Sequence, residues 1–69
     1  MFKKELLKSL IGKEVIISVM DYEGEFVIDK SYSILTDKDY EYYSTDNFIL
    51  YDHEEIAGNI YKIYLEVVE

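Results

Sequence analysis

The chain has 69 residues, with 15 carboxylates against seven lysines, no arginine, no cysteine and a formal net charge of −8 at pH 7. So short a chain is expected to form one domain, residues 1–69, which buries only about 60% of its unfolded surface. The lack of cysteine excludes disulfides and thiolate chemistry, and the acidity opposes binding to the phosphate backbone of a nucleic acid.

The first segment is predicted to be an amphipathic helix over residues 2–11. Its apolar residues recur at the spacing of a single helical face: Phe2, Leu6, Leu7, Leu10 and Ile11. Gly12 follows where a left-handed helix cap is favoured. The apolar face suits a membrane, a partner or the protein's own sheet. We expect the sheet, because a short chain needs that surface for its core.

The remaining chain is predicted to consist mostly of strands. EVIISVM is an almost wholly apolar run of strand length, which indicates burial on both faces or at a subunit contact. A turn follows at Asp21 to Gly24. A single helical turn is expected over 52–58, with Asp52 and Glu55 at the spacing of a capping box. The predicted strands cover residues 14–20, 25–35, 40–44, 48–51 and 59–68.

These elements predict a mainly β fold of the α+β class. An N-terminal helix followed by five short strands is typical of a strongly bent antiparallel sheet or of a small barrel. This layout resembles that of SH3-like and Sm-like barrels. The resemblance concerns topology and implies no function. The apolar runs are too short for a membrane span or a signal peptide, so we expect a cytoplasmic protein that does not bind membranes.

The stretch DKDYEYYSTD combines four carboxylates with three tyrosines. It resembles the start of a calcium-binding EF-hand loop, but that loop needs glycine and glutamate where Tyr42 and Phe48 stand. We expect a strand whose tyrosines either cover the sheet or bind a partner. Tyrosines beside carboxylates would also suit a cationic group held against the rings. The candidate partner-binding residues are Asp37, Asp39, Tyr40, Glu41, Tyr42, Tyr43 and Asp46.

The sequence contains no pattern that indicates catalysis, a metal or a cofactor. His53 is the only imidazole, and its acidic neighbours do not make a catalytic triad without a nucleophile. HEEIA has alanine where the helix of a zinc protease needs a second histidine. A chain of this size rarely encloses a substrate pocket, so we expect a protein that is not an enzyme.

The sequence therefore predicts a small acidic interaction protein, an inhibitor whose carboxylates imitate a nucleic acid and occupy a basic surface of a partner protein. Phage-encoded inhibitors of bacterial defence systems include small acidic proteins of this composition, and anti-defence is one setting for such a role. The alternative is a homo-oligomer that sequesters a small ligand such as a nucleotide signal, with bases stacked on tyrosine. The lysines that would meet its phosphates are Lys3, Lys4, Lys8 and Lys13. An Sm-like RNA-binding ring is a third hypothesis, which the acidic body disfavours.

Overall fold

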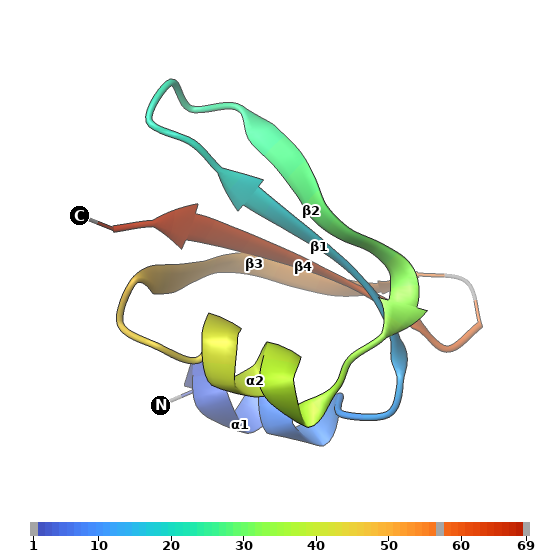
Figure 1. Ribbon diagram of the computed structural model, residues 1–69. Coiled ribbons are helices and arrows are strands. Elements are labelled where there is room, and N and C mark those ends of the chain that lie inside the picture. The colour runs from blue at the N-terminus through green and yellow to red at the C-terminus, as the bar shows by residue number, and fades with distance from the viewer. Residues whose placement is uncertain (1, 57, 69) are drawn as a thin grey trace.

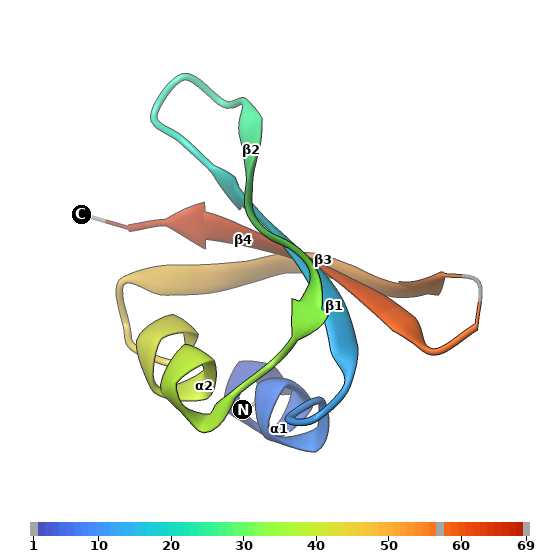
Figure 2. The ribbon, with the colours of Figure 1, turned by 45° about the vertical axis from the view of Figure 1, so that its right-hand side comes forward.

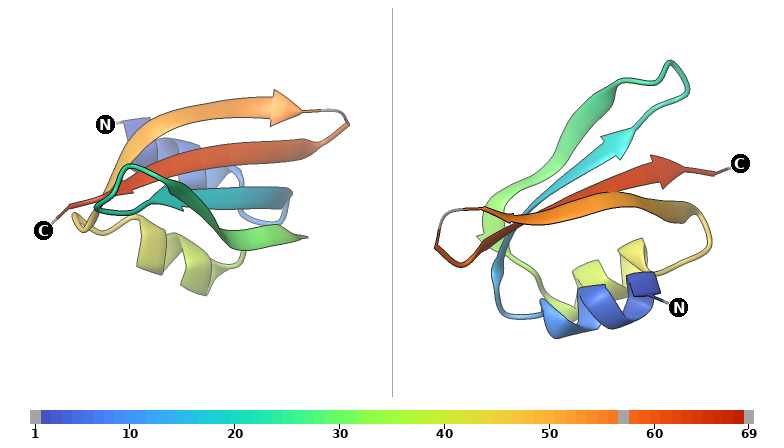
Figure 3. Two further views of the ribbon diagram at one scale, coloured as in Figure 1. Left: turned by 90° about the horizontal axis from the view of Figure 1, so that it is seen from above. Right: turned by 180° about the vertical axis from the view of Figure 1, so that it is seen from behind.

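The computed structural model describes residues 2–56 and 58–68, which form two helices and a four-stranded mixed sheet (Figure 1). In chain order the elements are α1 (Phe2–Ser9), β1 (Glu14–Met20), β2 (Phe26–Ile34), α2 (Asp37–Tyr43), β3 (Phe48–Ile56) and β4 (Ile60–Val67). The strand order is β2-β1-β4-β3, with β1 and β4 parallel and the other two pairings antiparallel. Both helices lie against one face of the sheet, and the other face is left uncovered (Figure 3).

The core lies between the helices and the two central strands. Val15 and Ile17 of β1 and Ile63 and Leu65 of β4 are fully or almost fully buried against the helix side. Ile16, which points to the other face, is also buried because it sits in the middle of the sheet. The apolar run of β1 therefore has the two-sided burial that its sequence indicates.

Helix α1 packs its apolar face on the sheet. Leu7 and Leu10 are buried in the core, with Leu6 and Ile11 packed around them. The connection to β1 turns at Gly12, whose φ of 90° suits glycine and whose amide donates to a carbonyl of the β2–α2 connection at 2.8 Å. Within the described part of the chain, neither helix is long and apolar enough to cross a membrane.

Helix α2 replaces the strand predicted over residues 40–44. Thr36 caps this helix: its hydroxyl accepts the Asp39 amide at 3.1 Å, and the Asp39 carboxylate accepts the Thr36 amide at 3.0 Å. These two reciprocal bonds satisfy backbone groups that would otherwise lack partners at the start of the helix. The capping box outweighs the alternation of tyrosine and glutamate that suggested a strand.

Strand β3 continues through residues 52–56, where the sequence predicted a helical turn; Ala57, in the same predicted turn, lies outside the described residues. The β3–β4 ladder places Glu54 opposite Lys62, and opposite charges across a ladder stabilise it. The Asp52 carboxylate, predicted to cap a helix, instead accepts the amide of the next residue at 2.8 Å. Pairing with β4 therefore overrides the local helix signal.

The prediction of five antiparallel strands in a sheet or barrel is wrong in strand number and in direction. The described sheet has four strands, and the central pair runs parallel. β2 and β3 form its two edges and are not paired with each other, so the sheet is open. The sheet is strongly twisted, and the turn of the β1–β2 hairpin diverges from the ends of β3 and β4 (Figure 2).

Candidate functional site

Asp39, one of the predicted partner-binding residues, is used inside the fold. Its carboxylate accepts the amide and the hydroxyl of Thr36 and forms an ion pair with Lys30 of β2 at 2.9 Å. Burial alone would raise its pKa, but the bonds from Thr36 and the Lys30 ammonium outweigh burial and hold the pKa of Asp39 below the ordinary value of 3.8. Asp39 therefore ties α2 to the sheet.

Tyr40 and Tyr43 also face the interior. Tyr43 is only 4% exposed, its ring lies 5.5 Å from that of Phe48, and its hydroxyl donates to the Asp29 carboxylate of β2. Burial, with the Asp29 bond adding to it, raises the pKa of Tyr43 well above its usual range. Tyr40 is half-buried and packs against the core. These rings cover the sheet instead of presenting a binding surface.

The solvent-facing remainder of the predicted site is small. Asp37, Glu41 and Asp46 are exposed, and so is Tyr42, whose ring lies 4.9 Å from that of Tyr43. The first two carboxylates belong to α2, whereas Asp46 lies in the loop before β3. The structure therefore leaves three exposed carboxylates and one exposed ring in this segment, and not the tyrosine-rich strand that the sequence predicted.

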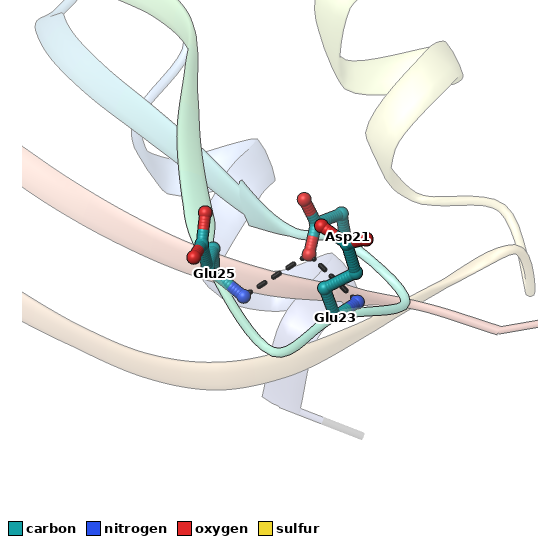
Figure 4. A group of neighbouring side chains, drawn as sticks. All are labelled: Asp21, Glu23 and Glu25. Atoms are coloured by element: carbon teal, nitrogen blue, oxygen red, sulfur yellow. Dashed lines mark hydrogen bonds between the residues drawn. The ribbon is translucent and has the colours of Figure 1, made fainter.

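A second group of carboxylates lies in the turn between β1 and β2. Oxygens of Asp21, Glu23 and Glu25 lie within 4.8 Å of one another (Figure 4). One Asp21 oxygen accepts the amides of Glu23 at 2.9 Å and Glu25 at 3.0 Å, and Gly24 adopts a φ of 82°. This is a side-chain-stabilised turn, so the cluster is explained by the local backbone and contributes negative charge to the end of the hairpin.

The four lysines predicted to meet a ligand's phosphates do not gather at one site. Lys3 and Lys4 line a surface cavity of about 550 Å³ beside the start of β3. Lys13 lines a different cavity, next to the turn before β4, and Lys8 is exposed on α1. Of the four lysines, only Lys3 and Lys4 line the same cavity.

Lys3 has a structural role at that cavity. Its ammonium donates to the carbonyls of Thr45 and Phe48, each at 2.6 Å, which fastens α1 to the loop before β3. Burial lowers the pKa of Lys3, with Asp46 acting in the opposite direction and Lys4 in the same one. Lys4 is the exposed ammonium at the cavity.

The sequence predicted that His53 lies in a turn, but the structure places it in β3. Its ring lies 5.3 Å from that of Phe2, on the helix side of the sheet. Successive residues of a strand point to opposite faces, so the side chains of Asp52 and Glu54 lie on the other face. This alternation keeps the imidazole away from the two acids that adjoin it in sequence.

The uncovered face of the sheet carries most of the large apolar side chains that are exposed. Val15 and Ile17 point to the helices, so alternate residues of β1 point away, and the cross-strand register carries this assignment to the paired residues of the other strands. Tyr51 and Tyr32 lie at irregularities of the register; the ring contact with Phe26 places Tyr51 on this face, and Tyr32 lies close enough to Lys62 to act on it electrostatically. The exposed apolar residues on this face are Phe26, Ile28, Tyr32 and Ile34 of β2 and Ile49 and Tyr51 of β3. Each is at least 40% exposed. Figure 3 (left) looks down on this face, with both helices behind it.

Three rings form a row across this face. Phe26 of the β2 edge lies 5.1 Å from Tyr64 of β4 and 5.5 Å from Tyr51 of the β3 edge, both in edge-to-face geometry. The row therefore reaches from one edge strand of the sheet to the other. The Lys62 ammonium lies 5.1 Å from the centroid of the Tyr64 ring, within the range of a cation–π contact.

The same face has an excess of carboxylates. Among the described strand residues, Glu14, Asp52, Glu54 and Glu66 lie on it by the register, against the one ammonium of Lys62. We call the surface formed by the six exposed apolar residues, Tyr64, these four carboxylates and Lys62 the open face. It combines apolar area, aromatic rings and negative charge, three properties that suit a partner with basic and aliphatic side chains.

Comparisons of the chain with protein-family models, with curated proteins and with solved structures found no match. The candidate sites are therefore compared by the side chains that each one exposes. The α2 surface and the hairpin turn offer carboxylates that the fold itself partly uses, whereas the open face offers rings and carboxylates together.

Proposed function

We propose that this protein is a non-enzymatic interaction protein whose open face binds a basic surface of a partner protein. The observation that carries the proposal is the row of rings formed by Phe26, Tyr64 and Tyr51, surrounded by an excess of carboxylates. Exposed apolar surface of this extent favours a partner, and the negative charge selects a positive one.

The partner side chains that fit are lysines and arginines with aliphatic stems. Their stems would pack on Ile28, Ile34 and Ile49, which are each more than half exposed, while the charged ends meet the carboxylates. Burial of apolar area supplies the affinity, and charge sets the rate and the choice of partner. An acidic face that meets basic residues would also compete with a nucleic acid for the same partner surface, so inhibition is the form of this function that we favour.

Two charge reversals of equal size test the location of the site. Asp52→Lys with Glu66→Lys changes the open face, and Asp37→Lys with Glu41→Lys changes α2 by the same amount. Titration of each variant with a lysine- and arginine-rich peptide at low ionic strength should show at least a tenfold loss of affinity for the first pair and a small loss for the second. Added salt should weaken wild-type binding, because exposed charges are screened.

Equal losses for the two pairs would mean that the peptide responds to net charge alone, and the proposed site would then be rejected. Circular dichroism and urea unfolding of both variants provide the check that the sheet remains folded. The α2 pair avoids Asp39, whose replacement would remove a helix cap and an ion pair as well as a surface charge.

A small-ligand function is the second candidate, and the cavity beside Lys3 and Lys4 favours it. Phe2, Phe48 and Leu50 form apolar walls there, and the Lys4 ammonium is exposed at its edge. Such a site would suit an anionic ligand with an apolar part. Titration with inorganic phosphate and with ADP should then shift amide resonances around the cavity. Lys4→Ala should abolish those shifts, and Lys8→Ala, which removes a lysine outside the cavity, should leave them unchanged.

A further inference from the structure

The ring row on the open face has a geometry that accepts a cation. Phe26 and Tyr51 come from the two edge strands, are 40% and 60% exposed, and meet at 5.5 Å with an interplanar angle of 62°. An edge-to-face contact leaves part of each ring face uncovered by its neighbour. Aromatic faces carry partial negative charge, so a cation above them is attracted.

The protein already places one of its own cations on this row. The Lys62 ammonium lies 5.1 Å from the Tyr64 centroid, and the adjacent Tyr64 side chain, with a smaller contribution from Glu54, raises the pKa of Lys62. This contact shows that the Tyr64 end of the row accommodates a basic group. Tyr51, at the other end of the row, has no such cation among the described residues.

Carboxylates flank the end of the row that Tyr51 occupies. Asp52 is the next residue and lies opposite Tyr64 in the ladder, and Glu66 lies opposite Ile49 one step further along the same face. A guanidinium group can stack on a ring with its flat face while its N–H groups reach carboxylates in its own plane. An ammonium group cannot use both kinds of contact in this way.

We propose that the Tyr51 end of the ring row receives an arginine side chain of the basic partner, stacked on Tyr51 and Phe26 and hydrogen-bonded to Asp52 or Glu66. This proposal rests on the function proposed above and specifies its partner: a protein with an exposed arginine among other basic residues. Because the Lys62 ammonium already occupies the Tyr64 end of the row, the arginine binds at the Tyr51 end.

The test uses three peptides that differ in one side chain. Each alternates glycine with arginine, with lysine, or with citrulline, which has the shape of arginine but no charge. Wild-type protein should bind the arginine peptide several-fold more tightly than the lysine peptide, and citrulline should bind at least tenfold more weakly than arginine. Tyrosine fluorescence and amide chemical shifts provide the readout.

Ring variants then locate the contact. Tyr51→Leu should weaken binding of the arginine peptide about fivefold to tenfold, and Tyr51→Phe should retain most of the affinity because it keeps the ring. Tyr22→Leu is the matched control, since Tyr22 lies in the hairpin turn and is 74% exposed but takes no part in the row. Urea unfolding of each variant verifies that the fold persists.

The outcomes separate this proposal from the function on which it rests. If Tyr51→Leu binds the arginine peptide like wild type while Asp52→Lys with Glu66→Lys loses it, the arginine site is overturned and the acidic open face stands. If arginine, lysine and citrulline peptides bind equally at low ionic strength, both proposals fail. If the wild type is a dimer that Tyr51→Leu dissociates, the face is a self-association surface and the arginine site is overturned.

Discussion

Some polar and aromatic side chains form contacts within the fold, and others of the same type are exposed to solvent. Tyr43 and Tyr42 are neighbours of identical chemistry in α2, yet the first is buried with its hydroxyl on Asp29 and the second is exposed. Asp39 and Asp37 divide in the same way. These two pairs allow the contribution of burial to be measured with matched substitutions.

Tyr43→Phe should reduce the free energy of unfolding by about 1.5 kcal/mol, because it leaves the Asp29 carboxylate without its hydroxyl donor. Tyr42→Phe removes an exposed hydroxyl and should change stability by less than about 0.5 kcal/mol. Urea unfolding at neutral pH compares the two. Equal effects would contradict the placement of Tyr43 on the sheet.

Asp39→Asn should cost roughly 1 kcal/mol at neutral pH, through a weakened helix cap and a lost ion pair that is partly exposed. The folded pKa of Asp39 lies below its ordinary value of 3.8, so its charge stabilises the fold above that value, and the contribution disappears as the pH falls through the folded pKa. The stability difference between wild type and Asp39→Asn should therefore shrink below about pH 4. Asp37→Asn, with the same change of charge, should show a much smaller difference at neutral pH.

Secondary structure elements differ in how far local sequence determines them. The apolar run of β1 and the helical spacing of α1 depend on side chains that face one buried surface, and both elements form close to where these patterns place them. The segment after Thr36 carried two signals: alternation of Tyr40 to Tyr43, which suggested a strand, and Thr36 with Asp39 three positions later, which is capping-box spacing. The second is decisive because it satisfies backbone groups.

Other elements depend on contacts between distant parts of the chain. The parallel pairing of β1 with β4 joins residues more than 40 positions apart, and β3 remains extended beyond Tyr51 because β4 pairs with it. The open face was not predicted, because its residues come from four strands whose order is not a local property. Alternating apolar residues in two edge strands were the only sequence signal for it.

An isoleucine-to-alanine substitution should lower the free energy of unfolding more in a central strand than in an edge strand. Ile17→Ala in central β1, at a fully buried side chain, should destabilise the protein by roughly 3 kcal/mol, close to the whole stability that a domain of this size has. Ile28→Ala on the β2 edge, where the side chain is 60% exposed, should cost less than about 1 kcal/mol. Thermal unfolding distinguishes them. A comparable loss at the two positions would contradict the strand order.

The whole molecule has its charges unevenly placed. Residues 1–13 have a charge of +3 and the rest of the chain −11, and α1, which carries Lys4 and Lys8, lies on the opposite side of the sheet from the open face (Figure 1). The lysines of α1 repel a basic partner that approaches this helix, whereas the open face offers carboxylates together with rings. Charge and apolar surface coincide on the one face that the protein does not use for its own core.

The most direct measurement is an amide chemical-shift map of the ¹⁵N-labelled protein, recorded during titration with the alternating arginine–glycine peptide. We predict that the largest shifts lie in β2, β3 and β4 at Phe26, Tyr51, Tyr64 and their neighbours, and that α2 changes little. Shifts centred on Asp37 and Glu41 of α2, or the absence of any shift at low ionic strength, would contradict the assignment of the open face as the binding surface.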